Sequence, residues 1–364
     1  MTGVMAGPAP RIAIISVLYK SERFVGPLLD SVAALDYPRD RLELHLVDNG
    51  PGDGSLAAAR QEIERRAGEL PEVIVHEPGR NEGFAIGNNI AIRAALMRAV
   101  DGCFLLNADA AFEPGALKEA VAVAQAAPGA GSIQSLLVLA DAPEVVNTRG
   151  NCIHYLGFGY AGGYRELRAA VPEEVAEVAY ASGAAVLLPR AALEEVGLFD
   201  ETLWLYHEDL DLGWRLRLHG YRNLLAPRSV CRHHYEWARS TTKWYWLERN
   251  RWLVVLKNYR LATLLLLLPM MLLFELGLVA LAVKGGWWRE KLRAMGTLLQ
   301  PRTWTYLARE RRRLGRARRV RDREILAHFT PVIAHPDFAS PLVSMFIEPI
   351  WKAAFRAVKA VVRW

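Results

Sequence analysis

The alternation of two kinds of segment along the first hundred residues limits the fold more strongly than any other feature of this sequence. Continuous apolar runs of strand length occupy residues 11–18, 42–47, 72–77 and 102–107. Segments with a helical spacing of apolar residues lie between them, at Phe24–Leu35, Leu56–Ala67 and Ala85–Val100. Strands that alternate with helices form a mostly parallel, doubly wound sheet. We therefore predict an α/β fold.

Carboxylates stand just after two of the predicted strands. Asp48 comes directly after the second strand, and Asp109 follows the fourth. In open α/β sheets, ligands bind beyond the carboxyl ends of the strands. We therefore expect a ligand site at this edge of the sheet.

Residues 141–182 are rich in glycine and turn-forming residues, and we expect a loop-rich insertion there. It contains "GFGYAG" at 157–162, which matches the spacing G-x-G-x-x-G. Neither a strand before it nor a helix after it is predicted, so we interpret it as a glycine-rich loop rather than a dinucleotide site.

The sequence "LWLYHEDLDLGWRLRLHG" places Glu208, Asp209 and Asp211 within four positions at a predicted helix start. Neighbouring like charges and partial burial raise the pKa of a carboxyl group, and the positive end of the helix dipole makes such crowding tolerable. A carboxylate with a raised pKa can act as a general base near neutral pH. The alternative is that the three side chains only cap and solvate the helix.

Three further short segments carry polar groups suited to binding. The turn "VDNGPGDGS" (47–55) could contact the edge of a nucleobase, or it could be an Asx-turn that caps the next helix. The glycines and amides of "NEGFAIGNN" (81–89) favour close approach of a phosphate or ribose. "LLNADA" (105–110) ends a strand with a carboxylate that could bind a divalent cation. His233 and His234 form a pair, an arrangement that is more often structural than metal-binding.

In this order and spacing, the segments resemble the inverting glycosyltransferases of family 2, which have the GT-A fold, and in particular their rhamnosyltransferase-like branch. The resemblance covers residues 10–250 and includes the blocks "SGAAVLLPRAALEEVGLFDE" and "LYHEDLDLGWRLRLHGYR". Three positions depart from the family pattern. Pro51 replaces the usual Ser of the first turn, and Asn107 replaces the first acid of the D-x-D motif, which removes one negative ligand from the metal. Lys20 follows Tyr19 where the family commonly has Tyr-Asn, and its charge could instead reach a phosphate.

The resemblance implies a role for each of these residues. Asp209 would be the general base, with Glu208 and Asp211 orienting it or binding acceptor hydroxyls. Asp109 and His233 would hold Mg²⁺ or Mn²⁺ on the diphosphate. The nucleotide sugar would be bound by Asp48, Asn49, Asn81, Gly83, Phe84, Asn88 and Asn107.

The resemblance also implies a reaction. A sugar, with rhamnose as a candidate, would pass from a dTDP- or UDP-linked donor to a lipid-linked saccharide in cell-envelope polysaccharide synthesis. The alternatives are a synthase that places a sugar directly on polyprenyl phosphate, and an inactive scaffold of the same fold.

Charge and hydropathy divide the remainder of the chain. Acidic residues outnumber basic ones in residues 1–225, basic residues predominate in 226–364, and the whole chain carries +6. Residues 261–283 form an apolar stretch long enough to cross a bilayer, with one charge, Glu275, and a central Pro269. Basic and apolar residues also alternate in 348–364 as in an amphipathic helix. This apolar content favours anionic lipid headgroups, rather than nucleic acid, as the partner of the basic part.

Both ends of the apolar stretch are flanked by basic residues, namely Arg249, Arg251, Lys257 and Arg260 before it and Lys284, Arg289, Lys291 and Arg293 after it. The positive-inside rule therefore places both ends on the cytoplasmic face. We expect Pro269 to break the stretch into an in-plane or re-entrant helix pair, rather than a single crossing. The arginine-dense segment 302–323 and the amphipathic end would lie against anionic headgroups.

These features predict three parts: a catalytic GT-A domain at 1–248, a membrane-associated helical segment at 249–300, and a basic tail at 301–364. Three scattered cysteines, Cys103, Cys152 and Cys231, give no disulfide framework and fit a reducing cytosol. We find no signal-peptide pattern at the N-terminus and expect the protein at the cytoplasmic face of the cell membrane.

Overall fold

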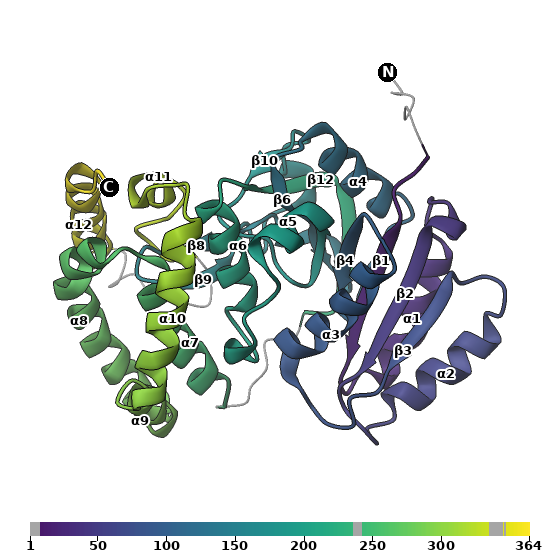
Figure 1. The fold of residues 1–364 in the computed structure, drawn as a ribbon, viewed down its shortest axis with the longest axis horizontal. Helices are drawn as coiled ribbons and strands as arrows, with labels where there is room; N and C mark the ends of the chain where they lie inside the picture. Colours follow the sequence, from purple (N-terminus) through teal and green to yellow (C-terminus); the bar gives the residue numbers. More distant parts are fainter. Residues whose placement is uncertain (1–7, 236–241, 335–344, 346) are drawn as a thin grey trace.

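A ten-stranded sheet forms the centre of the computed structural model, which describes residues 8–235, 242–334, 345 and 347–364 (Figure 1). Its first four strands are β1 (Ile12–Leu18), β2 (Leu42–Asp48), β3 (Glu72–His76) and β4 (Gly102–Leu106). The helices between them are α1 (Glu22–Ala33), α2 (Ser55–Arg65) and α3 (Gly83–Met97). The predicted alternation is therefore confirmed, and each element lies within a few residues of its predicted bounds.

The later strands complete the sheet, with β5 (Ala110–Phe112), β6 (Ala130–Leu139), β7 (Ala142–Thr148), β10 (Ala176–Glu177), β11 (Ala185–Pro189) and β12 (Arg222–His233). The hydrogen-bonded order is β10-β12-β6-β11-β4-β1-β2-β3. β11 pairs antiparallel with both β4 and β6, whereas β1, β2, β3 and β4 pair in parallel, as do β6 and β12. From β12 to β3, all strands except β11 thus run in one direction, which confirms the mostly parallel sheet.

Helices cover both faces of the sheet. One apolar core joins the sheet to α1, α2 and α4 (Ala116–Ala126), and another joins its opposite face to α3, α5 (Arg190–Val196) and α6 (Glu208–Leu218). Because β1, β2 and β4 run in parallel, their carboxyl ends lie at the same edge of the sheet. The loops after Leu18, Asp48 and Leu106 begin at this edge.

Short elements fill the predicted loop-rich insertion. β8 (Asn151–Ile153) and β9 (Gly159–Ala161) form an antiparallel hairpin that contains the glycines of 157–162. No helix follows this motif directly, so the geometry agrees with our rejection of a dinucleotide site.

In the part of the chain that the structure describes, six α-helices follow β12 and gather at one end of the molecule (Figure 1). They are α7 (Thr242–Asn258), α8 (Leu261–Lys284), α9 (Trp288–Thr297), α10 (Pro301–Ala317), α11 (Asp322–Leu326) and α12 (Glu348–Val361). A further apolar core joins most of them to α6 and to the β8–β9 hairpin. The predicted boundary after residue 248 falls inside α7.

Helix α6 belongs to both parts of the molecule. Leu212 and Leu216 pack in the core under the sheet, whereas Leu210, Trp214 and Leu218 pack in the core of the C-terminal helices. A helix apolar on both sides is expected where two layers meet. The start of α6, which carries the acidic cluster, is therefore fixed from two directions.

The expected break at Pro269 does not occur. Residues 261–284 form one continuous helix, α8, with Pro269 inside it on the exposed side. A proline removes one helical hydrogen bond, but the run of leucines around it has high helix propensity and retains the others. The prediction of a helix pair is therefore wrong.

The buried residues of helix α8 form one stripe along it: Thr263, Leu264, Leu267, Met271, Glu275, Leu278 and Ala282. Its other sides expose leucines and valines, and Leu276 is 70% exposed. By length and composition, α8 could cross a membrane. Residue Glu275, on the buried stripe, pairs with Arg251 of α7 and, at 2.5 Å, with Lys291 of α9.

Several arginines of 302–323 bond to other groups of the protein. Arg311 donates to the carbonyl of Tyr259 at 2.8 Å, and Arg318 pairs with Asp322 at 2.8 Å. Arg319 pairs with Glu195 at 2.6 Å. The expectation that this whole segment faces headgroups is thus too broad, because part of its charge neutralises buried or neighbouring groups.

Candidate active site

The turn after β2 is held by its own polar side chains. Asp48 is buried, and its Oδ1 accepts from the backbone of Gly50 at 3.3 Å. The amide of Asn49 donates to Asn81 Oδ1 at 3.3 Å and to the carbonyl of Gly83 at 3.2 Å, while its oxygen accepts from the backbone of Glu82 at 2.7 Å. Asn49 therefore ties the turn after β2 to the turn that opens α3.

Gly83 begins α3 at a place where no other residue fits. Its φ is +74°, and a Cβ there would lie 2.6 Å from the ring of Trp204. Asn81 accepts from the Gly83 backbone at 2.9 Å, and Asn88 donates to the carbonyl of Phe84 at 2.9 Å. The side-chain amides of residues 81–89 thus mainly bond to the backbone of this segment. The segment would therefore contribute to a ligand site mainly through the shape of its turn.

The end of β4 brings Asp109 and His233 together. Nε2 of His233 lies 3.3 Å from Oδ1 of Asp109, and its Nδ1 lies 2.9 Å from the side-chain oxygen of Asn147. A histidine that donates through Nδ1 to an amide oxygen presents the lone pair of Nε2. By contrast, Nδ1 of His234 lies 3.7 Å from Asp141. Of the two histidines, His233 is thus the one beside Asp109.

Among the described residues, no group of three or more His, Cys, Asp and Glu side chains could hold a metal ion. Asp109 and His233 offer one carboxylate oxygen and one imidazole nitrogen. Mg²⁺ binds typically through one or two carboxylates together with substrate phosphates and water. The pair therefore fits a cation shared with a bound diphosphate rather than a closed metal cage.

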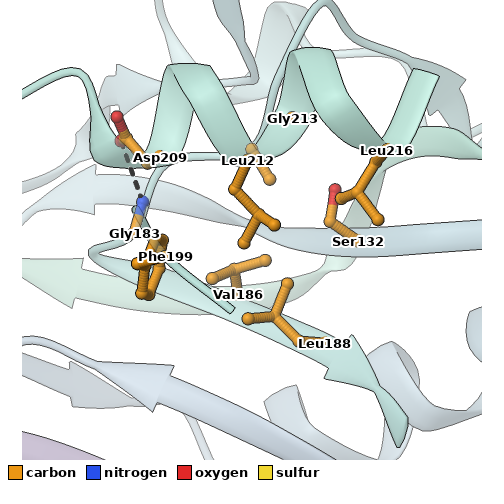
Figure 2. A pocket seen from close by; sticks show the side chains of 10 residues that line it. Ser132, Gly183, Val186, Leu188, Phe199, Asp209, Leu212, Gly213 and Leu216 are labelled. Carbon is orange, nitrogen blue, oxygen red and sulfur yellow. Dashed lines mark hydrogen bonds between the residues drawn. The ribbon is translucent and has the colours of Figure 1, made fainter. Parts of the chain in front are cut away.

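Asp209 lies in the first turn of α6, where it faces the segment before β11. Its Oδ2 accepts from the backbone of Gly183 at 3.2 Å (Figure 2). Its Oδ1 accepts from the backbone of Leu210 at 2.7 Å. Burial raises the pKa of the Asp209 carboxyl to about 6, although these backbone donors favour its ionised form. Asp209 is thus ionised at neutral pH and is a stronger base than an ordinary aspartate.

Glu208, directly before Asp209, is in a different state. It is buried, and its Oε2 has no hydrogen-bond partner. Burial, followed by the charge of Asp209, raises the pKa of Glu208 well above its ordinary value. Glu208 therefore keeps its proton to a higher pH than an ordinary glutamate does.

Asp211 lies deepest and faces away from the other two. Its side chain is fully buried, with Oδ2 2.7 Å from Arg215 Nε and Oδ1 2.9 Å from both Lys257 and Asn258. Burial acts to raise the pKa of Asp211, but Lys257 and Arg215 hold it below its ordinary value. Asp211 is thus a permanent anion in an ion pair, where an acceptor hydroxyl has no access.

A small cavity lies behind Asp209, between α6 and β11 (Figure 2). Its walls are mostly apolar, with Val186, Leu188, Leu212 and Leu216 among them. Its room of about 10 Å³ is at most that of one water molecule, so this cavity is a gap in the core rather than a sugar site.

Adjacent residues Gly183 and Ala184 connect the predicted site residues. The carbonyl of Ala184 accepts from the backbone of Asn107 at 2.9 Å, and Gly183 donates to Asp209. A Cβ on Gly183 would lie 3.1 Å from the ring of Phe84. The residues after β4, the start of α3 and the start of α6 thus converge at one edge of the sheet.

The structure adds residues that sequence analysis did not predict. Trp204 lies against Gly83 and stacks on Trp246 of α7 at 4.8 Å. Lys257 and Asn258 of the same helix hold Asp211. No sequence signal predicted the contacts of Lys257 and Asn258, because charged and amide residues of a helix are usually exposed.

Comparison with known proteins identifies the family. The sequence model described as "Glycosyltransferase like family 2" matches residues 10–254. The chain belongs to glycosyltransferase family 2. This glycosyltransferase is 28% identical over 247 residues to an N-acetylglucosaminyl-diphospho-decaprenol L-rhamnosyltransferase of Mycobacterium tuberculosis, covering 61% of this chain and 76% of the relative. It is 27% identical over 256 residues to a beta-monoglucosyldiacylglycerol synthase of Synechocystis, covering 67% and 47%.

Solved structures show that the fold of this glycosyltransferase is GT-A, as the resemblance implied. A mannosyltransferase of Pyrobaculum calidifontis, in complex with GDP-Man and Mn²⁺, superposes with a TM-score of 0.52 at 19% identity, covering 86% of both chains. GalNAc-T7 with UDP, GalNAc and Mn²⁺ superposes with a TM-score of 0.53 at 16% identity, covering 68% of this chain and 48% of that one.

Proposed function

We propose that this glycosyltransferase moves a sugar, with rhamnose as the first candidate, from a dTDP- or UDP-linked donor to a lipid-linked saccharide, with inversion. The observation that carries the proposal is the state of Asp209, an ionised carboxylate whose pKa is raised to about 6 at the edge of the sheet where ligands bind. Membership of the family supports the reaction class, and the names of the two relatives support a lipid-linked acceptor.

In the proposed reaction, the acceptor hydroxyl attacks the anomeric carbon while Asp209 takes its proton. A single displacement inverts the configuration and needs a carboxylate on the acceptor side only. Glu208, whose pKa is raised well above its ordinary value, and Asp211, which is paired with Lys257, would contribute by keeping Asp209 the one available base. This assigns Glu208 and Asp211 supporting roles.

Asp109 and His233 would hold Mg²⁺ or Mn²⁺. Such a cation would stabilise the negative charge of the departing nucleoside diphosphate. Asn147 would keep Nε2 of His233 directed at Asp109, since its oxygen accepts a hydrogen bond from Nδ1. The Mn²⁺ in the two solved relatives supports this proposal.

The donor would lie against the turns after β2 and before α3. Asp48 would contact the nucleobase, and Phe84 and the Gly83 backbone would pack on the nucleoside. Asn49, Asn81 and Asn88 would shape this surface, because their amides already bond to the chain. Asn107 would face the diphosphate as a neutral ligand.

We propose that α8 lies in the plane of the cytoplasmic leaflet. If α8 were to cross the bilayer, Glu275 would leave Arg251 and Lys291 and enter hydrocarbon, which is costly. Lying in plane, α8 keeps these ion pairs and buries its exposed leucines. Exposed basic residues of α12, Lys352, Arg356 and Lys359, would face anionic headgroups.

Products formed with Mn²⁺ test this function directly. Purified protein would be incubated with dTDP-rhamnose or UDP-sugars and a short-chain N-acetylglucosaminyl-diphospho-prenol, and products would be analysed by mass spectrometry. We expect a glycosylated lipid. Transfer to bare prenyl phosphate would favour the synthase alternative, and neither binding nor turnover of any donor would favour the inactive scaffold.

A further inference from the structure

The loop that leads into α6 has an unusual backbone. Trp204, Tyr206 and His207 have φ values of +59°, +66° and +66°. Side chains other than glycine rarely adopt this left-handed region because of steric cost. Three such residues within four positions need support from outside the loop to persist.

This loop controls two parts of the proposed active site. It ends at the N-terminus of α6, so its course sets the position of Asp209. At its other end, the carbonyl of Trp204 accepts from the backbone of Ala85 at 3.1 Å, and the Trp204 ring covers Gly83. A shift of the loop would therefore move the general base relative to the donor turn.

Asn250 of α7 supplies the support. Its Nδ2 lies 2.7 Å from the carbonyl of Leu203, 2.9 Å from that of Leu205 and 2.7 Å from that of Tyr206. Its Oδ1 accepts from Arg249 at 2.9 Å, and Arg249 also donates to the carbonyl of Thr202 at 2.8 Å. The Asn250 side chain is fully buried, so water does not replace these bonds.

We propose that Asn250 is a positioning residue for sugar transfer, an inference that rests on the proposed role of Asp209. Its side-chain amide bonds to three backbone carbonyls of the loop before α6. These bonds hold the loop in the conformation that places Asp209 beside the donor. Asn250 itself touches neither donor nor acceptor.

Replacement of the amide donor by an acceptor tests this role. In Asn250→Asp, an oxygen takes the place of Nδ2 and repels the three carbonyls at nearly unchanged volume. Asn223→Asp is the matched control, because Asn223 is also fully buried and its Nδ2 donates to the carbonyls of Ala179 at 2.8 Å and Gly213 at 3.0 Å, outside the loop. Asn250→Ser, which keeps one donor, replaces Asn250→Asp if that variant does not fold.

Two readouts are measured on the full chain. With dTDP-rhamnose and the prenyl-linked acceptor, we expect kcat of Asn250→Asp to fall roughly tenfold to hundredfold, as for a small misplacement of a catalytic group, with the donor KM nearly unchanged. Hydrogen exchange of the peptide that contains 203–210 should become faster in Asn250→Asp and stay as in the wild type in Asn223→Asp.

The two readouts separate the possible failures. If the wild type transfers no sugar, the proposed function fails, but the exchange measurement still tests whether Asn250 holds the loop. The positioning role is overturned if Asn250→Asp leaves exchange of 203–210 unchanged. It is also overturned if both variants lose kcat in proportion to their loss of thermal stability.

Discussion

At the scale of single residues, the site depends on how three neighbouring carboxyl groups are kept in different states. Glu208 is buried without a partner for Oε2, Asp209 receives two backbone N–H groups, and Asp211 is paired with Arg215 and Lys257. Groups whose surroundings push their pKa values apart can take separate roles in one reaction. Crowding of the three carboxyl groups therefore costs less than their spacing implies, because the pKa of Glu208 is raised well above its ordinary value and Asp211 is paired with two cations.

The raised pKa of Asp209 predicts how activity and stability depend on pH. A general base acts when ionised, so kcat should rise with pH and level off above about 6. The folded state also keeps a proton that the unfolded chain releases between the ordinary value of 3.8 and about 6, so this group lowers stability as pH rises through that window.

A pH–rate profile and thermal unfolding of Asp209→Asn at several pH values check both consequences. The variant should gain stability relative to the wild type at neutral pH, and this gain should shrink as pH falls below the window. A kcat that is constant across the window would contradict the assignment of Asp209 as the base.

The contact between His233 and Asn147 predicts which side chains affect metal affinity. Asp109→Asn and His233→Ala should weaken Mn²⁺-dependent binding of UDP, and Asn147→Ala should lower metal affinity about 10–100-fold by releasing the His233 ring. His234→Ala is the matched control, since His234 faces Asp141. Isothermal calorimetry of UDP with and without Mn²⁺ measures these effects, and an equal loss in both histidine variants would remove His233 from the metal site.

At the scale of elements, the strands and helices of the first hundred residues could be predicted because their burial follows from local apolar patterns. The edge where Asp48, Asp109 and Asp209 gather followed from sheet topology and the family resemblance. The surroundings of α6 could not be predicted, because Asn250, Lys257 and Asn258 reach it from a helix about forty residues further along the chain. Pro269 was misjudged because its local cost is smaller than the cooperative stability of a long leucine-rich helix.

Helix α8 is attached to α7 and α9 through ion pairs of Glu275. We therefore predict that truncating this one side chain lowers the stability of the protein strongly. Glu275→Ala leaves Arg251 and Lys291 with one carboxylate fewer in a buried cluster, and breaking such a pair costs about 3–5 kcal/mol. Leu276→Ala, at a position that is 70% exposed, is the control and should change little. Urea unfolding measures both, and equal midpoints would show that the ion cluster does not hold α8.

At the scale of the whole molecule, the candidate active site and the C-terminal helices form one connected body, since α6 packs in both cores. If α8 lies in the membrane surface, this arrangement would hold Asp209 at a fixed distance from the bilayer. An in-plane α8 predicts that Leu272→Glu with Leu276→Glu weakens binding to anionic vesicles at least about tenfold, because burying a leucine contributes about 1.5–3 kcal/mol.

Vesicle co-sedimentation measures this loss, with thermal unfolding to confirm that the variant is folded. Both side chains are exposed, so stability should be retained. In intact cells, labelling of Lys284→Cys from outside would establish a crossing helix and contradict the in-plane arrangement.

The central claim is that Asp209 takes the proton of the acceptor in a sugar transfer. The most direct measurement compares donor affinity and transfer rate of wild type and Asp209→Asn, with dTDP-rhamnose or the UDP-sugar that the wild type uses, in the presence of Mn²⁺. We predict a nearly unchanged donor Kd and a rate that falls about 10²–10⁴-fold, as expected for removal of a general base. Transfer at the wild-type rate, or a loss fully explained by weaker donor binding, would contradict this claim.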